Sequence, residues 1–540
     1  MLFRGLLYLI FLLASFSQPT IWPAPSSITH HDGEEQILIN RSLFRWGDLP
    51  LDGSGIIQQG VERYERIIFA WGNGSHVDNS INVFVYFCIE DTSRTSLSID
   101  TDESYSITIT RDGDDGDDSA TINIKLHSKT PFGTLHALET LSHLISFSPI
   151  SKSYFIEYLV DVTDSPRFPH RGVMIDTGRR FYSTSSIKRI IEGMSYLKLN
   201  VLHWHVSDSE SMPLKSYTYP KLALDGAFLE DAVYTHDDVK GIIDYAFHRG
   251  IRVIPEFDMP THNYAYKLSQ PELFTNCSKT WTDRYLNKDS FDPTLPSVYN
   301  FIDNVLGEFL DLLFIDEWVH LGGDEFDPEC WNSTPSIVSY MKENNLTDTN
   351  DVFRLFESKI FDIAHNKHKK TVVFWDEVYE SGADVGDSIV QTWRNGSMES
   401  ALGDNRKIIN SYGYYFTQGL SSGYGGVTFS DVYDKEPIPE GFSSASENFL
   451  GAEACMWGVS IDEFNFDQVF FLRGMAFAER MWSFPLNMNI NDEGNMSARA
   501  MPQRCRLLQR GIKVGAADWG LVNEDMDRRN IYTQCEVWLP

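Results

Sequence analysis

The sequence predicts a (β/α)₈ TIM barrel preceded by a smaller α+β domain that contains an antiparallel sheet. Short apolar segments that read as buried strands recur through the second part of the chain, and amphipathic segments with helical periodicity stand between them. A third observation is the series of carboxylates and aromatic residues that directly follow these strands. An open doubly wound sheet is the alternative, but no GxGxxG motif or phosphate loop supports it.

Length and charge narrow the class of protein further. At 540 residues the chain exceeds what one hydrophobic core usually serves, which favours two domains. Acidic residues outnumber basic ones 76 to 45, and the formal net charge is -31. Such a surface repels nucleic acid and anionic lipid, so a polyanionic partner is disfavoured.

The first 17 residues have the features of a cleavable secretory signal. One early charge at Arg4 precedes an apolar run over residues 5–16, and a small residue follows at Ser17. A retained membrane anchor is the alternative, although the run is too short to cross a bilayer and no stop-transfer charges follow it. Because no later apolar stretch has spanning length, we expect a lysosomal or secreted protein without a membrane span.

Cysteines and glycosylation sequons agree with secretory routing. The chain holds 6 cysteines and no CxxC pair, which favours disulfides over a zinc site. Several N-x-S/T sequons are candidate glycosylation sites, although some must occur by chance. They begin at Asn40, Asn73, Asn276, Asn332, Asn345, Asn395 and Asn495.

Residues 18–165 read as the N-terminal α+β domain. Alternating segments at 82–89, 105–111 and 120–126 predict antiparallel strands, and residues 130–145 have helical periodicity. The acidic run at 112–118 lies between two of these strands. It lacks the spacing and the distal Glu of an EF-hand, so a solvated hairpin turn is favoured over a cation loop.

A segment at 160–170, which contains Pro166 and Pro169, is the predicted domain boundary, and the barrel domain is predicted over residues 166–540. The helices are predicted from spacing: Val239, Ile242 and Ala246, for example, fall on one helical face. Predicted helices cover 184–199, 235–248, 297–313, 352–365 and 466–481. Predicted strands cover 172–176, 201–206, 251–257, 318–325, 371–374, 388–391, 407–410 and 449–455.

The residues that follow the predicted strands are the main functional signal. In a (β/α)₈ barrel the carboxyl ends of all strands meet at one mouth, so these side chains would line a single site. Carboxylates accept hydrogen bonds from sugar hydroxyls, and flat aromatic rings cover the apolar face of a sugar. The residues are Asp176, Asp208, Glu256, Asp258, Asp324, Glu325, Trp375, Asp376, Trp393, Tyr412, Tyr414 and Trp457.

The adjacent pair Asp324 and Glu325 is the most conspicuous of these. Retaining glycosidases usually draw two carboxylates from separate strands, and neighbouring residues on a regular strand point to opposite faces. The pair can share a site only where the strand unwinds, which Gly322 and Gly323 would permit. A solvated strand end is the simpler alternative for the pair considered alone.

A second pair, His203 and His205, shares one face of a predicted strand. With nearby carboxylates this spacing is compatible with a metal hydrolase. No third ligand stands at a supporting spacing, so polar side chains inside the barrel are the favoured interpretation.

Several motifs in one order resemble the eukaryotic lysosomal or secreted β-N-acetylhexosaminidases of glycoside hydrolase family 20. The central match is HLGGDE at 320–325, which is similar to the active-site signature of that family. The other matches are RGVMIDT at 171–177, LNVLHWH at 199–205, EFDMPTH at 256–262, GAEACMWG at 451–458 and the segments around Trp375 and Trp393. The segment IWPAP at 21–25 looks like the mature start of such a protein.

The resemblance implies an exo-acting hydrolase of terminal β-linked N-acetylhexosamine, in glycans or chitooligosaccharides, that needs no cofactor and no metal. Family 20 enzymes use the 2-acetamido group of the substrate as the nucleophile. By that implication Glu325 is the general acid and base, Asp324 orients the acetamide, and Tyr414 holds its carbonyl. A pKa of Glu325 above the ordinary value is expected from Asp324 and an aromatic pocket. The resemblance also implies substrate-binding roles for Arg171, Asp208, His262, Trp375, Trp393 and Trp457.

Two positions depart from the family pattern. Phe416 and Val459 stand where many members carry an acid or amide that holds the outer sugar hydroxyls, which leaves the preference between GlcNAc and GalNAc open. A sugar-binding relative with reduced turnover, or an enzyme narrowed to a special linkage, is the alternative. The resemblance further implies a homodimer and the disulfide pairs Cys277 with Cys330 and Cys505 with Cys535, leaving Cys88 and Cys455 free.

Overall fold

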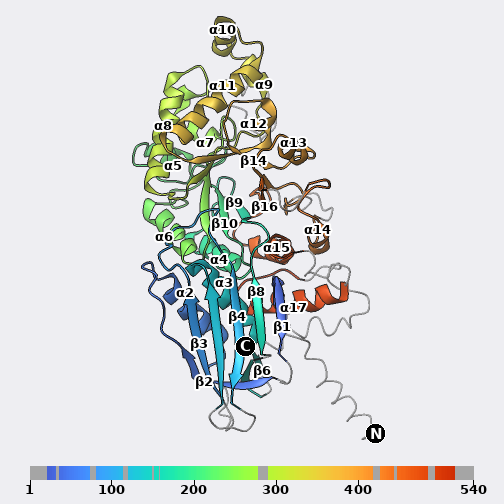
Figure 1. Cartoon of the computed structure of the whole chain (residues 1–540). Helices are drawn as coiled ribbons and strands as arrows, with labels where there is room; N and C mark the ends of the chain where they lie inside the picture. The colour runs from blue at the N-terminus through green and yellow to red at the C-terminus, as the bar shows by residue number, and fades with distance from the viewer. Residues whose placement is uncertain are drawn as a thin grey trace, which may run out of the picture.

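The computed structural model describes most of the chain as two packed parts, an N-terminal sheet and a barrel above it (Figure 1). The described residues are 21–31, 36–72, 81–113, 120–148, 151–156, 159–275, 277, 290–417, 426–442, 447–484, 493–516 and 535. For residues 493–498 only the backbone is described. The predicted signal segment and most of the acidic run at 112–118 lie outside these residues.

The N-terminal domain is one eight-stranded sheet in the order β1-β8-β4-β5-β3-β2-β7-β6. The prediction of an antiparallel sheet is only partly right, because β3 pairs in parallel with both β2 and β5. The β4–β5 pair, which flanks the acidic run, is antiparallel as predicted. The strands are β1 (Ser27–His30), β2 (Ile37–Trp46), β3 (Ile81–Ile89), β4 (Tyr105–Asp112), β5 (Thr121–Ser128), β6 (Ile145–Ser148), β7 (Ser153–Ile156) and β8 (Val160–Asp164).

Two helices, α2 (Ile56–Ile68) and α3 (Pro131–Leu144), pack on this sheet and on each other. Every residue of α3 is buried, because the helix is enclosed between the sheet and the elements that follow it in the chain. Thr130 caps its N-terminus by accepting a hydrogen bond from the Gly133 N–H, 3.3 Å away. The helix is therefore part of the junction between the two domains.

Strands β9 to β16 form a closed parallel barrel, which excludes the open-sheet alternative. Closure depends on Gly451, since a Cβ there would lie 1.9 Å from the carbonyl oxygen of His170 on the neighbouring strand. The strands are β9 (His170–Asp176), β10 (Val201–His205), β11 (Arg252–Glu256), β12 (Trp318–His320), β13 (Thr371–Trp375), β14 (Ile389–Thr392), β15 (Ile408–Asn410) and β16 (Phe449–Met456).

Five helices of the barrel domain, α4, α6, α8, α11 and α15, match the predicted ones closely. A capping box at Thr235, where Asp238 returns the hydrogen bond, fixes the start of α6. The longer helices are α4 (Thr184–Ser195), α6 (His236–Phe247), α8 (Pro296–Leu312), α10 (Pro335–Glu343), α11 (Thr349–Asp362), α15 (Phe466–Trp482) and α17 (Glu493–Gln509). The shorter ones are α5 (Lys221–Gly226), α7 (Tyr264–Lys267), α9 (Pro328–Asn332), α12 (Asp376–Ser381), α13 (Ser397–Gly403) and α14 (Phe429–Asp434), with η1 (Pro271–Leu273) and η2 (Ile363–Lys367).

Helices α2, α10 and α17 and the short helices α5, α7, α9, α12, α13 and α14 were not predicted from the sequence. The residue that follows α17 contacts the N-terminal domain. Arg510, just after α17, donates to Glu139 of α3 over 2.7 Å. Trp482, at the end of α15, belongs to the hydrophobic core of the N-terminal sheet. The two domains therefore share a packed and charged junction.

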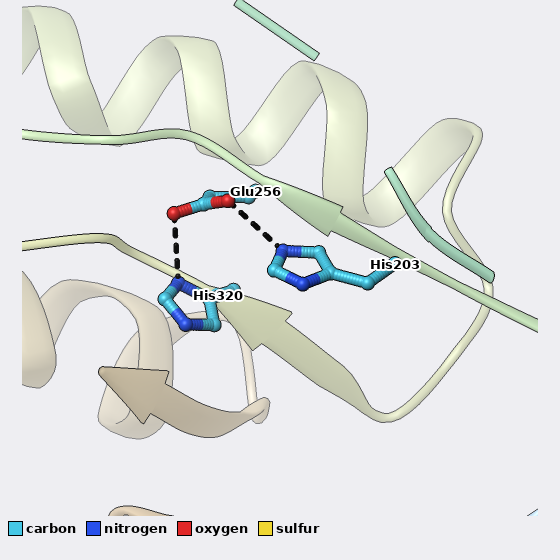
Figure 2. Close-up of side chains that lie close together, drawn as sticks. All are labelled: His203, Glu256 and His320. Atoms are coloured by element: carbon cyan, nitrogen blue, oxygen red, sulfur yellow. Dashed lines mark ion pairs between the residues drawn. The ribbon is translucent and has the colours of Figure 1, made fainter. Parts of the chain in front are cut away.

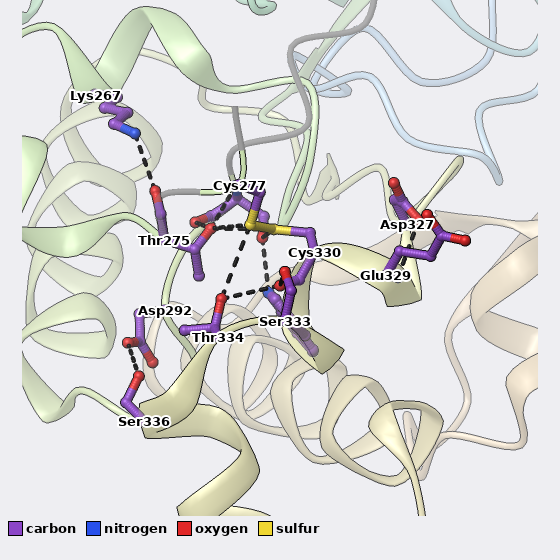
Figure 3. The surroundings of a disulfide bond; sticks show 12 residues. Lys267, Thr275, Cys277, Asp292, Asp327, Glu329, Cys330, Ser333, Thr334 and Ser336 are labelled. Atoms are coloured by element: carbon purple, nitrogen blue, oxygen red, sulfur yellow. Dashed lines mark hydrogen bonds between the residues drawn. A yellow bond between two sulfur atoms is a disulfide. The ribbon is translucent and has the colours of Figure 1, made fainter. Parts of the chain in front are cut away.

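Both implied disulfides are present in the structure. Cys277 bonds to Cys330 of α9, and Figure 3 shows Thr275 and Thr334 beside this bond. Cys505 of α17 bonds to Cys535, and Cys88 and Cys455 are free. Disulfides of this kind indicate an oxidising secretory compartment. Within the described residues, none of the helices has the length and apolar character that crossing a membrane requires.

The candidate glycosylation sites differ in accessibility. Asn40 is only 7% exposed, and its Oδ1 accepts a hydrogen bond from the Ser42 N–H, so the structure argues against a glycan at this position. Asn332, Asn345 and Asn395 are exposed and remain candidates. Asn73 and Asn276, and the side chain of Asn495, lie outside the described residues.

Candidate active site

The chain unwinds directly after β12, as the two glycines predicted. Gly322 has φ +70° and Gly323 has φ +93°. A Cβ at Gly322 would lie 1.7 Å from Asp258 Oδ1, so this position accepts no other residue. The Gly323 N–H donates to the same Asp258 oxygen over 3.0 Å. This close contact locks the turn that carries Asp324 and Glu325 to the mouth of the barrel.

Beyond this turn the two adjacent carboxylates face different environments. Asp324 is 8% exposed, whereas the side chain of Glu325 is 45% exposed. Glu325 has φ +53°, a left-handed conformation that is costly for a non-glycine residue and is often found at functional sites. The pair therefore offers one buried and one accessible carboxylate in the same place.

His262 links the two carboxylates to Asp208. Its Nε2 lies 3.2 Å from Glu325 Oε2 and 3.9 Å from Asp324 Oδ2, while its Nδ1 lies 3.5 Å from Asp208 Oδ1. Burial alone would lower the pKa of His262, but Asp208 and the other carboxylates outweigh it and raise the pKa well above its ordinary value. The Nδ1 atom also lies 3.2 Å from Arg179 Nη2, so the ring is contacted by a guanidinium as well as by carboxylates.

The pKa values of the pair are shifted in opposite directions. The hydrogen bond from His262 lowers the pKa of Glu325, which is the reverse of the expected rise. Burial raises the pKa of Asp324 well above its ordinary value, and the nearby Asp258 adds to the rise. The resemblance placed His262 in the same site as Glu325, but it did not predict that this histidine would lower the pKa of Glu325.

Four aromatic residues form the wall beside these carboxylates. The ring centroids of Trp375 and Trp457 lie 6.0 Å apart. Tyr415 continues the wall, with centroids 5.9 Å from Trp393 and 6.1 Å from Trp457. The Trp393 indole N–H donates to Glu377 over 3.0 Å, and burial followed by Asp324 raises the pKa of Glu377 to about 9. The three predicted tryptophans thus lie together.

Tyr414 is not part of this wall, so the prediction that it holds the substrate is wrong by one residue. Its ring packs against Phe477 of α15, with centroids 5.1 Å apart, and it is completely buried. Tyr415 has the place predicted for Tyr414: it faces the tryptophans, and burial, Cys455 and Asp324 raise its pKa. Phe416 packs on Phe470 of α15 and is fully buried, so it points to the core like Tyr414.

The structure also contradicts the sugar-binding role predicted for Arg171. This residue stands at the amino end of β9, opposite to the mouth, and its side chain is fully buried. Its guanidinium donates to Glu103 of the N-terminal domain over 2.6 Å and to the carbonyl oxygens of Lys198 and Phe168. Arg171 therefore joins the two domains.

Arg179 is the mouth arginine that sequence reasoning missed. It follows the carboxyl end of β9, and its Nη2 lies 2.8 Å from Asp208 Oδ2. It also contacts Asp176 over 3.1 Å and lies above the Trp457 ring, 4.9 Å from the centroid. The signal was available, since Arg179 stands three residues after Asp176, a strand-end carboxylate of the predicted site.

Below the mouth, the barrel interior is filled by alternating imidazoles and carboxylates. Figure 2 shows Glu256 between His203 and His320, at 3.0 Å and 3.2 Å. His203 also lies 2.6 Å from Glu453. Burial would lower the pKa of His203, but the two carboxylates raise it to about 9. The ligand atoms of His203, Glu256 and His320 also lie within 4.8 Å of one another, close enough to hold one metal ion, so the polar-interior and metal interpretations of these histidines both stay predictions.

His205 connects this interior network to the mouth. It contacts Glu256 on one side and Asp208 on the other, at 2.5 Å and 2.9 Å. Asp208 in turn contacts Arg179 and His262. A continuous series of charged contacts therefore fixes the orientation of His262, and through it that of Glu325.

Comparison with known proteins assigns both domains. Residues 168–485 match the catalytic domain of glycosyl hydrolase family 20, and residues 21–144 match a domain described as beta-acetyl hexosaminidase like. The chain is 31% identical over 531 residues to mouse beta-hexosaminidase subunit alpha, covering 94% of this chain and 96% of the relative. It is 33% identical over 520 residues to Dictyostelium discoideum beta-hexosaminidase subunit B1, covering 92% and 89%.

Solved structures show the same architecture. The fold superposes on a chitobiase from Flavobacterium johnsoniae with a TM-score of 0.76 and 26% identity, covering 91% of this chain and 73% of that one. It superposes on a beta-N-acetylhexosaminidase from Bacteroides fragilis with a TM-score of 0.71 and 25% identity, covering 92% and 97%.

Proposed function

Because the chain belongs to glycosyl hydrolase family 20, we propose that it removes terminal, non-reducing β-linked N-acetylhexosamine from glycans by substrate-assisted, retaining hydrolysis. One observation carries the mechanism. The buried Asp324 and the accessible Glu325 lie side by side at the mouth, so they can address different parts of one sugar. An enzyme nucleophile would instead have to approach the opposite face of the ring from the acid.

Glu325 is the general acid of the first step. It protonates the glycosidic oxygen while the bond between that oxygen and the anomeric carbon breaks. In the free enzyme the raised pKa of His262, 3.2 Å away, and the lowered pKa of Glu325 favour the proton on the imidazole. When the sugar displaces water from the mouth, the charged pair loses solvation, which favours transfer of this proton to Glu325.

The acetamido group of the substrate is the nucleophile of the same step. Its carbonyl oxygen attacks the anomeric carbon and closes an oxazolinium ring, so positive charge develops on the acetamide nitrogen. Asp324 accepts a hydrogen bond from this N–H, and Tyr415 donates to the carbonyl oxygen. Water then opens the ring at the anomeric carbon, giving its proton to Glu325, and the β configuration is retained.

The aromatic wall and Arg179 hold the rest of the sugar. Trp375, Trp393 and Trp457 enclose the acetamide and the apolar ring face. Arg179 and Asp208 support His262, and they are the charged groups nearest to the sugar hydroxyls in this proposal.

Val459 bears on which epimer is accepted. It stands two residues after Trp457 and is 60% exposed, so an outer hydroxyl near it meets an apolar side chain. A valine offers no hydrogen bond that distinguishes an axial from an equatorial O4. We therefore propose that both GlcNAc and GalNAc are substrates, whereas an enzyme narrowed to one linkage would hydrolyse only one of them.

The test of this function is hydrolysis of chromogenic GlcNAc and GalNAc β-glycosides, followed in the presence of a thiazoline that mimics the oxazolinium. We expect turnover of both glycosides and competitive inhibition by the thiazoline, since its ring reproduces the cyclised acetamide. The matching glucoside, which lacks an acetamide, should not be hydrolysed. Turnover that the thiazoline does not inhibit would contradict substrate assistance. Sugar binding without turnover would support the alternative of a sugar-binding relative with reduced turnover.

Tyr415 and Tyr414 form a matched pair for testing the carbonyl contact. We expect Tyr415→Phe to reduce kcat on the order of 10²-fold, because it removes the hydrogen-bond donor that positions the carbonyl oxygen for attack on the anomeric carbon. Tyr414→Phe should leave kcat within about threefold, since that hydroxyl is enclosed by α15. Both rates come from the same chromogenic assay, and a larger loss in Tyr414→Phe would reverse the assignment.

The proposed function includes a cellular location and an oligomeric state for this protein. The disulfides support entry into the secretory pathway, and the family supports a lysosomal or secreted location. Relatives from mouse are named as subunits alpha and beta, which supports an assembly of more than one chain, and for this chain we propose a homodimer.

A further inference from the structure

Glu377 lies in the wall of the sugar site, outside the group of residues that act in the proposed mechanism. It stands in the first turn of α12, which follows directly after Trp375 at the end of β13. Its side chain is 18% exposed, and Trp393 donates its indole N–H to Oε2 over 3.0 Å. A carboxyl in this place can orient the aromatic wall without touching the reacting atoms.

Asp376, which directly precedes Glu377, is the ionised member of this adjacent pair. It is fully buried, and its Oδ1 accepts a hydrogen bond from Arg394 Nε over 2.8 Å. Its Oδ2 accepts from the backbone N–H groups of Trp393 and Arg394, each over 3.1 Å. Several donors, one of them a guanidinium, favour the carboxylate form of a buried acid. The negative charge of the pair therefore belongs to Asp376.

Glu377 lacks a comparable set of donors among the described residues. Its Oε1 lies 3.6 Å from Arg394 Nε, which is beyond hydrogen-bond distance. The Arg394 guanidinium is engaged instead by Asp376 and by Glu380, whose Oε2 accepts from it over 2.8 Å. Burial raises the pKa of Glu377 to about 9, and Asp324, Asp376 and a hydrogen bond with Asp376 add to the rise. The Glu377 carboxyl is therefore protonated at neutral pH.

Charged and titratable groups face Glu377 from the ends of neighbouring strands. They are Asp324 after β12, Arg394 after β14 and Tyr415 after β15, in addition to Asp376 on α12 itself. An ionised Glu377 would place a second negative charge near Asp324 and disfavour the carboxylate form that the proposed mechanism needs there. The protonated form of Glu377 avoids this repulsion.

Trp393 connects Glu377 to the tyrosine that contacts the acetamide in the proposed mechanism. The Trp393 ring stacks on Tyr415, with ring planes 21° apart and centroids 5.9 Å apart. The backbone N–H of Trp393 donates to Asp376 and its indole N–H donates to Glu377, so the start of α12 fixes both parts of this residue. A tilt of Trp393 would displace Tyr415, and a misplacement of about 1 Å can cost on the order of 10²-fold in rate.

We propose that Glu377 is a positioning residue of the hydrolysis, which stays protonated in the working enzyme and holds Trp393 against Tyr415 as an uncharged partner. Its carboxyl group accepts the indole N–H through one oxygen and donates its proton to Asp376 through the other. The proton thus removes a charge from the surroundings of Asp324 and keeps the hydrogen bond that orients the wall. This inference rests on the proposed function, because the wall and Tyr415 act there on the acetamide.

Two replacements of Glu377 distinguish an uncharged hydrogen-bond partner from a charged one. Glu377→Met removes the acceptor, so kcat/KM for the chromogenic GlcNAc glycoside should fall about tenfold or more, and the thiazoline should bind correspondingly more weakly. Glu377→Gln keeps an acceptor and a donor, so at neutral pH it should restore kcat and KM to within about threefold of wild type. Glu399→Gln, at an exposed position of α13, is the control and should change neither value. Equal losses in the Gln and Met variants, or full activity of the Met variant, would overturn the proposal.

A second measurement does not depend on activity. After labelling with fluorotryptophan, the fluorine NMR signal of Trp393, identified by its loss in Trp393→Phe, reports the charge of the group that accepts the indole N–H. In the wild type this signal should shift as the pH rises through about 9, where Glu377 loses its proton, and in Glu377→Gln it should not. A wild-type signal that did not shift would refute the protonated state. A wild type that showed the shift but hydrolysed neither glycoside would refute the proposed function and still support Glu377 as the uncharged partner of Trp393.

Discussion

Replacement of Glu325 by Gln should lower kcat for an unactivated disaccharide by 10²–10⁴-fold, the range of general acid–base catalysis. The amide has nearly the shape of the carboxylic acid but cannot give a proton to the leaving oxygen. The loss should be smaller for an aryl glycoside whose leaving group needs no protonation. Steady-state kinetics on both substrates measures the difference, and the positions of the aromatic wall are not altered by the change.

The pH dependence of the same variant gives an independent check. Glu325 and His262 together must retain one proton, and the carboxylates around His262 raise its pKa well above the ordinary value after outweighing burial. In the wild type, kcat/KM should therefore fall as the pH rises through the pKa of this pair. The Gln variant should lack this fall, because its residual rate does not depend on proton transfer.

Glu329→Gln is a suitable control for Glu325→Gln. Glu329 is an exposed residue in the first turn of α9, close in sequence to the pair but outside the site. Its replacement should leave kcat within about twofold. If Glu325→Gln retained wild-type kcat on the disaccharide, the general acid would have to be another group, with Glu377 the next carboxyl along the wall, beside Trp393.

The sequence could predict the barrel because its signals are local. Each strand is a short apolar run, and each helix repeats its apolar residues on one face, so α6 and β10 differ from their predicted bounds by a residue or so. The parallel pairing of β3 with β2 and β5 could not be predicted from these local signals. Parallel or antiparallel pairing is decided by how the connections cross the sheet, and alternation along a strand is the same in either case.

The errors at the site have a common physical origin. The local turn decides whether a residue near the end of a strand faces the mouth or the core. A shift of one residue along the chain reverses this orientation. Tyr414 and Tyr415 are adjacent, yet one packs on α15 and the other faces the tryptophans. Arg171 is the second residue of β9 and Arg179 follows its carboxyl end, so the two arginines lie at opposite ends of the strand. Choosing between such neighbours needs the direction of the chain, which composition and spacing do not give.

The pKa of Glu325 shows the same limit for electrostatics. A neighbouring carboxylate and aromatic rings are visible in the sequence, and both raise the pKa of an acid. The cation that reverses the shift comes from a loop after β11, and its charge depends on Asp208 after β10. The direction of the shift is therefore a property of three separate strand ends brought together by barrel closure.

Asp324→Asn is expected to lower kcat by about 10²–10³-fold. This is the loss that follows when one preorganised group that stabilises transition-state charge is removed from an active site. The carboxylate is needed where the acetamide nitrogen becomes positive, and an amide oxygen offers a dipole in place of a full charge. Burial, with Asp258 adding to it, raises the pKa of Asp324 well above its ordinary value, so the group ionises only as the pH rises. Wild-type kcat/KM should thus increase as the pH rises through the pKa of Asp324.

The Asn variant imitates the protonated form of Asp324 at every pH, so this rise at low pH should disappear while the fall at high pH remains. Asp327→Asn, at the partly exposed cap of α9, is the matched control and should keep both limbs. The thiazoline should bind the Asn variant at least tenfold more weakly, because the charged ring nitrogen loses its carboxylate partner. A variant that kept the rise at low pH would show that another group, with Asp258 the nearest candidate, carries the ionisation on which the acetamide depends.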